Sequence, residues 1–147
     1  MEYLFVSGED RAFDAVTDRC RKYVAAELDS EGSDIDDALG RSGDLILACE
    51  GCNIVGFAAL SSKAKEVYIN QIVVKNRFRK QGIGTALIAE VIKVAGNRDV
   101  TCHVRFSNEA SRTLFSGCGF QEDETKKTKL SNFYIKPGRM FNKSGNR

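Results

Sequence analysis

The chain has 147 residues, of which 42% are hydrophobic and 29% charged, and its formal net charge is +2. This length and composition predict one domain with a single sizeable core. No apolar stretch of about 20 residues is present to span a bilayer, and no charged-then-apolar leader follows Met1, so the sequence argues against a membrane or secreted protein. We therefore expect a cytoplasmic protein with no membrane partner.

A regular alternation of strand-like and helix-like segments runs through the chain and indicates an α/β fold. Short apolar or β-branched runs between turn residues predict the strands. They are expected at residues 3–6, 45–49, 54–60, 66–74, 101–106, near 120 and at 130–135.

Four helices are expected among these strands. Ser7-x-x-Asp10 resembles a capping box before a first helix whose apolar positions run from Phe13 to Leu28. The other helices are expected near residues 34–39, 85–95 and 109–116.

The cysteines number five and are scattered through the chain. An odd, scattered set favours reduced core and surface thiols over a disulfide framework. Cys49 and Cys52 have the spacing of a zinc knuckle, but a structural zinc site needs a second pair, and none exists at a matching spacing. We therefore predict no metal site.

The most informative segment is residues 72–84, where a β-branched run passes through basic residues into a glycine turn and then a helix. Gly82 and Gly84 let the backbone turn tightly, and the start of the next helix adds its positive dipole end. Nearby Arg and Lys residues add full charges, so we expect a pyrophosphate or a similar polyanion here. A Walker loop is excluded because no Lys-Ser/Thr pair follows Gly84, and a dinucleotide fingerprint because Leu87 replaces a third small residue.

Two segments resemble motifs of the GNAT superfamily of N-acyltransferases. The Arg-x-x-Gly-x-Gly run from Arg79 to Gly84, which follows a strand, resembles the acyl-CoA motif of that family. Residues 102–120 resemble its later motif, with a strand, an Asn that opens a short helix and a closing Gly-Phe. The part from Val104 to Asn108 resembles the protein N-terminal acetyltransferase branch.

The resemblance implies a fold and a domain organisation. It predicts an α/β GNAT fold with a central mixed, mostly antiparallel, twisted sheet of about six or seven strands and about four helices. The strand at 66–74 and the next strand are expected to splay apart. Residues 1–137 would form a single acetyltransferase domain, and 138–147 a polar, basic C-terminal tail.

The resemblance also implies acetyl-CoA as co-substrate, bound without a metal. In the family, the splayed strand holds the acyl and pantetheine amides, the glycine turn holds the pyrophosphate, and the Asn contacts the pantetheine arm. Ordinary alternatives remain: a core strand for 72–74, a helix N-cap for Asn108 and a solvated helix residue for Arg112. The residues assigned to the cofactor site are Ile72, Val73, Val74, Arg79, Lys80, Gln81, Gly82, Ile83, Gly84, Thr85, Asn108, Arg112 and Phe115.

Three residues are candidates for the general base that deprotonates an amine. The family often places a Glu four residues before the position of Ile72; Tyr68 occupies that position here, with Glu66 on the same strand face. The N-terminal branch places a Glu five residues before the Asn; His103, the only His in the chain, occupies it. A neutral imidazole can take an ammonium proton near neutral pH. A satisfied strand histidine and a surface carboxylate are the alternatives for His103 and Glu66.

The general acid is the clearest departure from the family pattern. Phe115 matches a Tyr whose hydroxyl protonates the leaving thiolate in many members, and a phenyl ring cannot do that. Water, Tyr68 or Ser111 could supply the proton, or the thiolate could leave unassisted. The alternative is a regulatory module that binds acyl-CoA and turns it over weakly. For the enzyme, direct attack is favoured because no cysteine lies in an acyl-carrier motif.

The uneven distribution of charged residues along the chain bears on which kind of amine the protein would accept. The first 50 residues carry 13 acids and 5 bases, and the residues after Glu124 carry 7 bases and no acid. An acidic wall would favour a small cationic amine, whereas the resemblance near Asn108 favours a peptide or protein N-terminus; the acidic run at 29–37 could equally be a solvated loop. Nucleic acid is an unlikely partner, since the basic end is more simply a final strand and a tail. A homodimer is possible because family members are often dimers.

Overall fold

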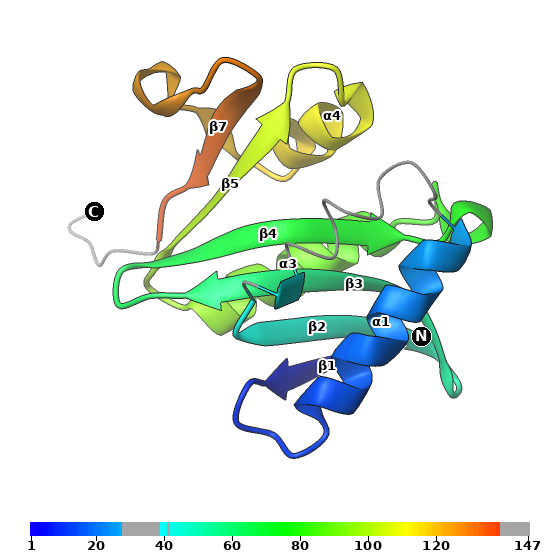
Figure 1. The fold of residues 1–147 in the computed structure, drawn as a ribbon. Helices are drawn as coiled ribbons and strands as arrows, with labels where there is room; N and C mark the ends of the chain where they lie inside the picture. The colour runs from blue at the N-terminus through cyan, green and yellow to red at the C-terminus, as the bar shows by residue number, and fades with distance from the viewer. Residues whose placement is uncertain (28–38, 41, 139–147) are drawn as a thin grey trace.

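The structure is a computed structural model and describes residues 1–27, 39–40 and 42–138. One seven-stranded sheet, in the order β1-β2-β3-β4-β5-β7-β6, forms its centre (Figure 1). The strands are β1 (Glu2–Ser7), β2 (Asp44–Glu50), β3 (Asn53–Ser62), β4 (Glu66–Val74), β5 (Asp99–Arg105), β6 (Gln121–Glu122) and β7 (Ser131–Lys136). The helices of the described residues are α1 (Phe13–Glu27), α3 (Ile83–Ala95), α4 (Glu109–Gly117) and two 3₁₀ turns, η1 (Asn76–Phe78) and η2 (Glu124–Lys126).

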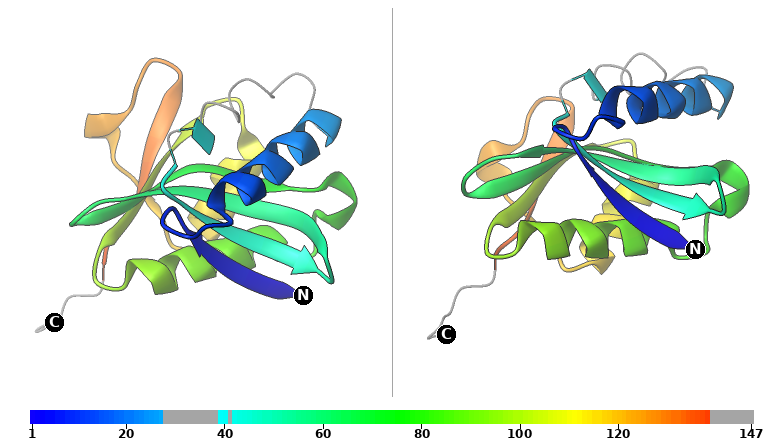
Figure 2. Two further views of the ribbon diagram at one scale, coloured as in Figure 1. Left: turned by 60° about the horizontal axis from the view of Figure 1, so that its bottom comes forward. Right: turned by 90° about the horizontal axis from the view of Figure 1, so that it is seen from below.

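Helices cover both faces of the sheet. Figure 2 shows α1 on one face and α3 with α4 on the other. Because side chains alternate along a strand, each face has its own core. The α3-side core includes Val67, Ile69 and Leu87, and the α1-side core includes Cys20 and Phe57.

The pairing of β4 differs on its two sides. It pairs antiparallel with β3 from Ser62↔Val67 to Gly56↔Val74, but parallel with β5 only from Glu66↔Asp99 to Ile69↔Cys102. β5 then continues alongside β7, so the two strands diverge beyond Ile69, as Figure 1 shows. The prediction of a mixed, mostly antiparallel sheet with a splayed strand pair is therefore confirmed.

The structure corrects the predicted capping box and refines the start of α3. α1 begins at Phe13, because Asp10 accepts a hydrogen bond from the Ala12 N–H at 2.8 Å and Ser7 Oγ accepts one from Glu9, which form turns rather than a capping box. α3 begins at Ile83, two residues before the predicted Thr85.

Two predicted segments lie almost entirely outside the described residues. The short helix expected at 34–39 lies outside the described residues except for its last position, and of the 138–147 tail only Gly138 is described. Within the described ranges, no helix is long and apolar enough to cross a bilayer.

Candidate active site

The N-terminus of α3 presents free backbone donors. Gly82 is the residue before the helix, with φ of 81°, and no side chain caps the helix there. The first ladder bond runs from the Ala86 N–H to the Gly82 carbonyl at 2.9 Å, so the N–H groups of Ile83, Gly84 and Thr85 precede it. No acidic residue lies in this first turn. The arrangement suits an anion.

The basic segment before α3 is ordered by its own side chains. Arg79 Nε donates to the Val74 carbonyl at 3.0 Å, and Gln81 Nε2 donates to the Arg77 carbonyl at 3.3 Å. Lys80 has φ of 62°, a left-handed conformation that no other non-glycine residue in the described part adopts. The sequence prediction missed this turn at Lys80, because a lysine gives no signal for positive φ.

Gly84 has a packing role rather than a turn role. It lies in the first turn of α3, and a Cβ built there would lie 3.1 Å from Leu114 Cδ2. The missing side chain therefore lets α4 approach the start of α3. The prediction that Gly82 and Gly84 both shape the turn holds only for Gly82.

The open edge of β4 presents alternate backbone groups. The Lys75 N–H donates to the Val55 carbonyl at 2.9 Å, and the register from Ala59↔Gln71 to Gly56↔Val74 is constant. Since ladder bonds of an antiparallel pair involve every second residue, Val73 faces β3, and Ile72 and Val74 direct their N–H and C=O groups to the open edge. The bond from Arg79 to the Val74 carbonyl agrees with this assignment. Val73 was predicted to contact the cofactor through its backbone. That prediction is corrected, because its backbone faces β3 and its side chain packs in the α1-side core.

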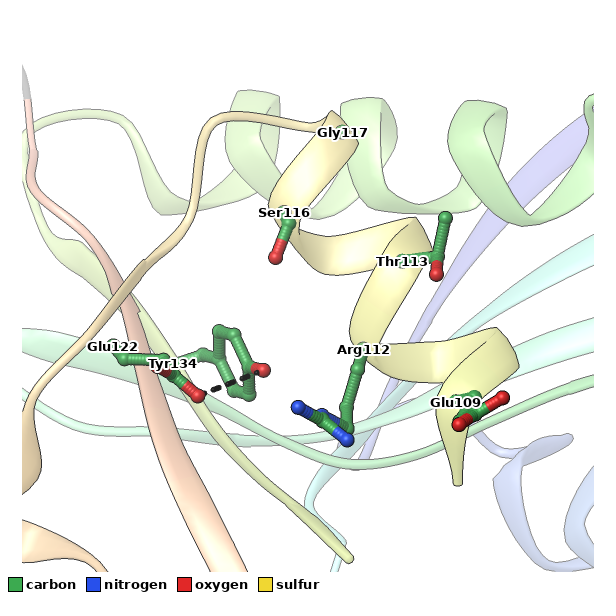
Figure 3. Close-up of a pocket in the computed structure, with 7 residues that line it drawn as sticks. All are labelled: Glu109, Arg112, Thr113, Ser116, Gly117, Glu122 and Tyr134. Atoms are coloured by element: carbon green, nitrogen blue, oxygen red, sulfur yellow. Dashed lines mark hydrogen bonds between the residues drawn. The ribbon is translucent and has the colours of Figure 1, made fainter. Parts of the chain in front are cut away.

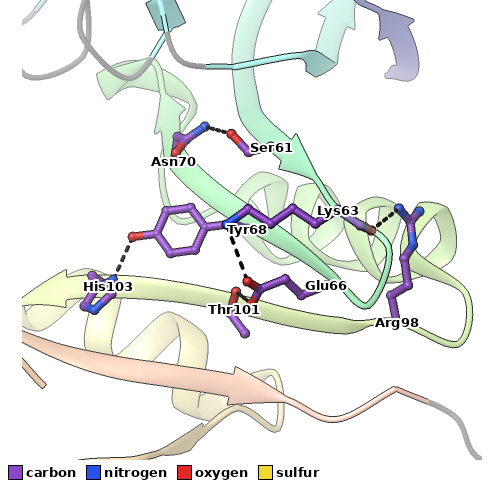
Figure 4. A network of polar contacts seen from close by, with 8 residues as sticks. All are labelled: Ser61, Lys63, Glu66, Tyr68, Asn70, Arg98, Thr101 and His103. Atoms are coloured by element: carbon purple, nitrogen blue, oxygen red, sulfur yellow. Dashed lines mark hydrogen bonds and ion pairs between the residues drawn. The ribbon is translucent and has the colours of Figure 1, made fainter. Parts of the chain in front are cut away.

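Polar side chains join β4 and β5 on the α1 face (Figure 4). The Tyr68 hydroxyl lies 2.7 Å from His103 Nδ1, and Thr101 Oγ1 donates to Glu66 Oε2 at 2.9 Å. Lys63 Nζ lies 3.7 Å from Glu66 Oε1. The structure therefore brings together all three predicted base candidates, with Tyr68 and His103 nearer to the point where the strands diverge than Glu66.

The two ring nitrogens of His103 have different surroundings. Nε2 lies 3.4 Å from the Lys126 carbonyl, and Nδ1 faces the Tyr68 hydroxyl. These contacts fit a neutral ring that accepts at Nδ1 and carries its proton at Nε2, a tautomer assigned from the network. The Phe133 ring packs edge-on to the imidazole, with centroids 4.9 Å apart.

Helix α4 begins beside the open edge. Asn108 Oδ1 accepts a hydrogen bond from the Ser111 N–H at 3.1 Å, so Asn108 is an N-cap, the alternative considered from the sequence. Phe115 is 4% exposed and packs against Phe120 and Tyr134, at centroid distances of 5.0 and 6.3 Å. Its side chain therefore belongs to the core at this point.

Arg112 lies on the face of α4 away from Leu114, and hence away from the start of α3. Its Nη1 donates to the Phe106 carbonyl at 3.1 Å, and its Nε is buried without a hydrogen-bond partner among the described residues. The side chain lines a hollow of about 830 Å³ between α4 and strands β6 and β7 (Figure 3). Tyr134 donates to Glu122 in the same hollow, at 3.2 Å. The structure does not bring Arg112 to the predicted phosphate site.

Two of the five cysteines are deeply buried thiols. Burial raises the pKa of the Cys20 thiol to about 12 and also raises the pKa of Cys102. Neutral buried thiols are poor nucleophiles. Within the described ranges, no group of three or more His, Cys, Asp or Glu residues could hold a metal ion.

Comparisons with known proteins agree with this geometry. The family model described as acetyltransferase (GNAT) matches residues 11–120. Cysteine-rich protein 2-binding protein of Mus musculus is 36% identical over 69 residues, which are 47% of this chain and 9% of that protein. The match thus spans less than a tenth of that relative's length.

Two solved structures show the fold. The ribosomal-protein-S18-alanine N-acetyltransferase of Escherichia coli has a TM-score of 0.66 at 19% identity, covering 97% of both chains. The PaiA N-acetyltransferase of Thermoplasma acidophilum, in complex with coenzyme A, has a TM-score of 0.65 at 15% identity, covering 93% of this chain and 99% of that one. Because the family model covers most of the chain, and the fold and both motifs agree with it, this protein belongs to the acetyltransferase (GNAT) family.

Proposed function

We propose that this protein is an N-acetyltransferase that moves an acetyl group from acetyl-CoA to a primary amine by direct attack. One observation carries the proposal: β4 loses β5 as a neighbour after Ile69, and its free edge leads directly to the uncapped N-terminus of α3. The pantetheine arm of acetyl-CoA, with its amides, and the pyrophosphate that follows it need those two features in that order. The five free cysteines suit a reducing compartment such as the cytoplasm.

The residues present fit acetyl-CoA. Ile72 would hydrogen-bond the amides of the pantetheine arm through its outward N–H and C=O groups, and Val74 through its N–H, since its carbonyl accepts from Arg79. The N–H groups of Ile83, Gly84 and Thr85 would hold the pyrophosphate, and Gly82 leaves open space beside them, since a Cβ there would meet no atom within 4 Å. Lys80 and Arg79 would add charge. Bound acetyl-CoA supplies the activated acyl group.

We assign amine activation to the Tyr68–His103 pair. The acceptor nitrogen would give a proton to the Tyr68 oxygen while the Tyr68 hydroxyl proton moves to His103 Nδ1, across the 2.7 Å contact. The imidazolium that results keeps its Nε2 proton directed at the Lys126 carbonyl. Glu66 bonds to Thr101 in the closed part of the strand pair, so we give it a supporting role.

The leaving thiolate receives no proton from Phe115. This ring is buried and carries no hydroxyl, and the Tyr68–His103 pair holds the proton taken from the amine in the proposed transfer. We propose that the thiolate leaves without a side-chain acid, which a thiol pKa near 8.5 allows. Water then protonates it.

Two measurements test the proposal. Calorimetric titration with acetyl-CoA should show binding, and thiol release should follow when peptides with free N-termini are added. Binding without thiol release, across peptides and small polyamines, would overturn catalysis and favour the regulatory module. Absence of binding would overturn the whole assignment of residues 72–85.

A further inference from the structure

The loop from Asp123 to Leu130 is fixed against the candidate base. Asp123 accepts hydrogen bonds from the Thr125 N–H at 3.0 Å and the Thr125 hydroxyl at 2.6 Å, and these bonds lower the pKa of its carboxyl group. The Asp123 N–H donates to the Phe133 carbonyl, and the Thr128 N–H to Ser131. The loop is therefore held on β7 at both ends.

Lys126 lies at the inner side of this loop. Its carbonyl lies 3.4 Å from His103 Nε2, and its Nζ lies over the Phe133 ring, 5.3 Å from the centroid. The Phe133 and His103 centroids are 4.9 Å apart, so the ammonium group is at most about 10 Å from the imidazole. The candidate base thus has a cation and an aromatic surface beside it.

The loop carries a small net positive charge. Lys126, Lys127 and Lys129 are all exposed, and none has an ion-pair partner within the described ranges. The carboxylates of the loop are Asp123, which is bonded to Thr125, and Glu124. A hydrogen-bonded carboxylate keeps its charge, and Lys126 helps to lower the pKa of Asp123, so the loop sets three cations against two carboxylates, a net charge of +1.

We infer that the acceptor is a peptide N-terminus with an acidic residue at its second or third position. This inference rests on the proposed function. An extended peptide advances about 3.3–3.6 Å per residue, so a chain whose amine is at Tyr68 and which crosses Phe133 would bring one of those side chains to Lys126. Charge complementarity of this kind selects partners. The lysines disfavour a cationic polyamine, and the acidic run at 29–37 lies outside the described residues.

Three peptides test the inference, identical except at positions two and three, which are Glu-Glu, Gln-Gln or Lys-Lys. We expect kcat/KM to decrease in that order, by about tenfold between the first and last, because pairs of exposed charges contribute about 0.2–1 kcal/mol each. Raising the salt from about 0.05 to about 0.5 M should reduce the difference, since salt screens exposed charges.

A matched pair of variants locates the selectivity. Lys126→Glu should decrease the ratio of kcat/KM for the acidic and basic peptides by about tenfold. Lys65→Glu changes the net charge equally but lies in the exposed turn at the other end of β4, and should leave the ratio unchanged. A ratio cancels any general loss of folded or active enzyme.

The outcomes separate the two proposals. Turnover of all three peptides at equal kcat/KM overturns the acidic acceptor and leaves the transferase standing. An equal change of the ratio in both variants also overturns it, because the selectivity would then come from net charge. If none of the three peptides is turned over, both the proposed transfer to peptide N-termini and the preference for acidic peptides are overturned.

Discussion

The two halves of the sheet on either side of β4 are built differently. The closed half comprises β1–β4 with α1 and α3, and there each strand pairs with its neighbour along nearly its full length. The open half comprises β5, β7, β6 and α4, and it joins β4 through four residue pairs. Ordinary packing completes the closed half, whereas incomplete pairing leaves the open half with a free strand edge. The candidate site lies where the two meet.

Strands of both halves carry buried residues, such as Val100 in β5, but the helices differ in burial. Phe57, Leu45 and Leu60, in the closed half, are fully buried. Helix α4, in the open half, buries only Phe115 among its residues. We therefore expect stability to depend mainly on the closed half and cofactor binding on the junction.

The largest effect is expected at the junction itself. Gly82→Val should weaken acetyl-CoA binding by at least about 100-fold, because a β-branched residue opposes φ of 81° and its side chain occupies the space beside the α3 donors. Calorimetry measures this change.

Gly51→Val is the matched control. Gly51 also has positive φ, at 61°, and open surroundings, but it lies in the turn between β2 and β3. It should lower stability similarly and leave acetyl-CoA affinity unchanged. If Gly82→Val binds as tightly as Gly51→Val, the anion site is placed wrongly.

The second effect concerns the hydrogen bond between Tyr68 in β4 and His103 in β5. His103→Gln should lower kcat by about 100-fold, because proton transfer by a positioned side chain typically contributes at least this much. Affinity for acetyl-CoA, measured by calorimetry, should not change. Glu66→Gln is the control, with kcat expected within about threefold; an equal loss there would move the base to Glu66.

The third prediction probes the core of the open half. Phe115→Tyr should lower the free energy of unfolding by about 1–3 kcal/mol, because it buries a hydroxyl beside the Phe120 and Tyr134 rings. Urea denaturation measures this loss, and Phe120→Tyr should show a similar one. A kcat increase above about tenfold without loss of stability would mean that the new hydroxyl reaches the thiolate.

The smallest effect sharpens the description of the closed half. Burial raises the pKa of Cys20 from 9.0 to about 12, so the native state favours the neutral thiol. The contribution of this neutral thiol to the free energy of unfolding is fully present below about pH 9. It decreases by about 1.4 kcal/mol per pH unit as the pH rises toward about 12.

The variant Cys20→Ala should lack this part of the decrease in unfolding free energy at alkaline pH. Urea denaturation at several pH values, compared with the unsubstituted protein, measures the difference. Cys52→Ala is the control because Cys52 is exposed. If the unfolding free energy of Cys20→Ala falls with pH as steeply as that of the unsubstituted protein, the Cys20 thiol is accessible to water.

The sequence by itself determined the elements and the cofactor motif of this protein. A β-branched, apolar run before the glycine turn predicted β4 at Glu66–Val74, and the glycine signal predicted the start of α3 within two residues. Such features depend on local propensity, which neighbouring residues in the chain already contain.

Tertiary structure decided which groups meet. A register shift between Ala59 and Leu60 leaves Asn70 as an extra residue in β4, and this sets Ile72 and Val74 rather than Val73 toward the open edge. The contacts of His103 with Tyr68 and Lys126 join residues 35 and 23 positions apart. Periodicity along a strand cannot report such pairings, because they depend on which strands become neighbours and where their pairing ends.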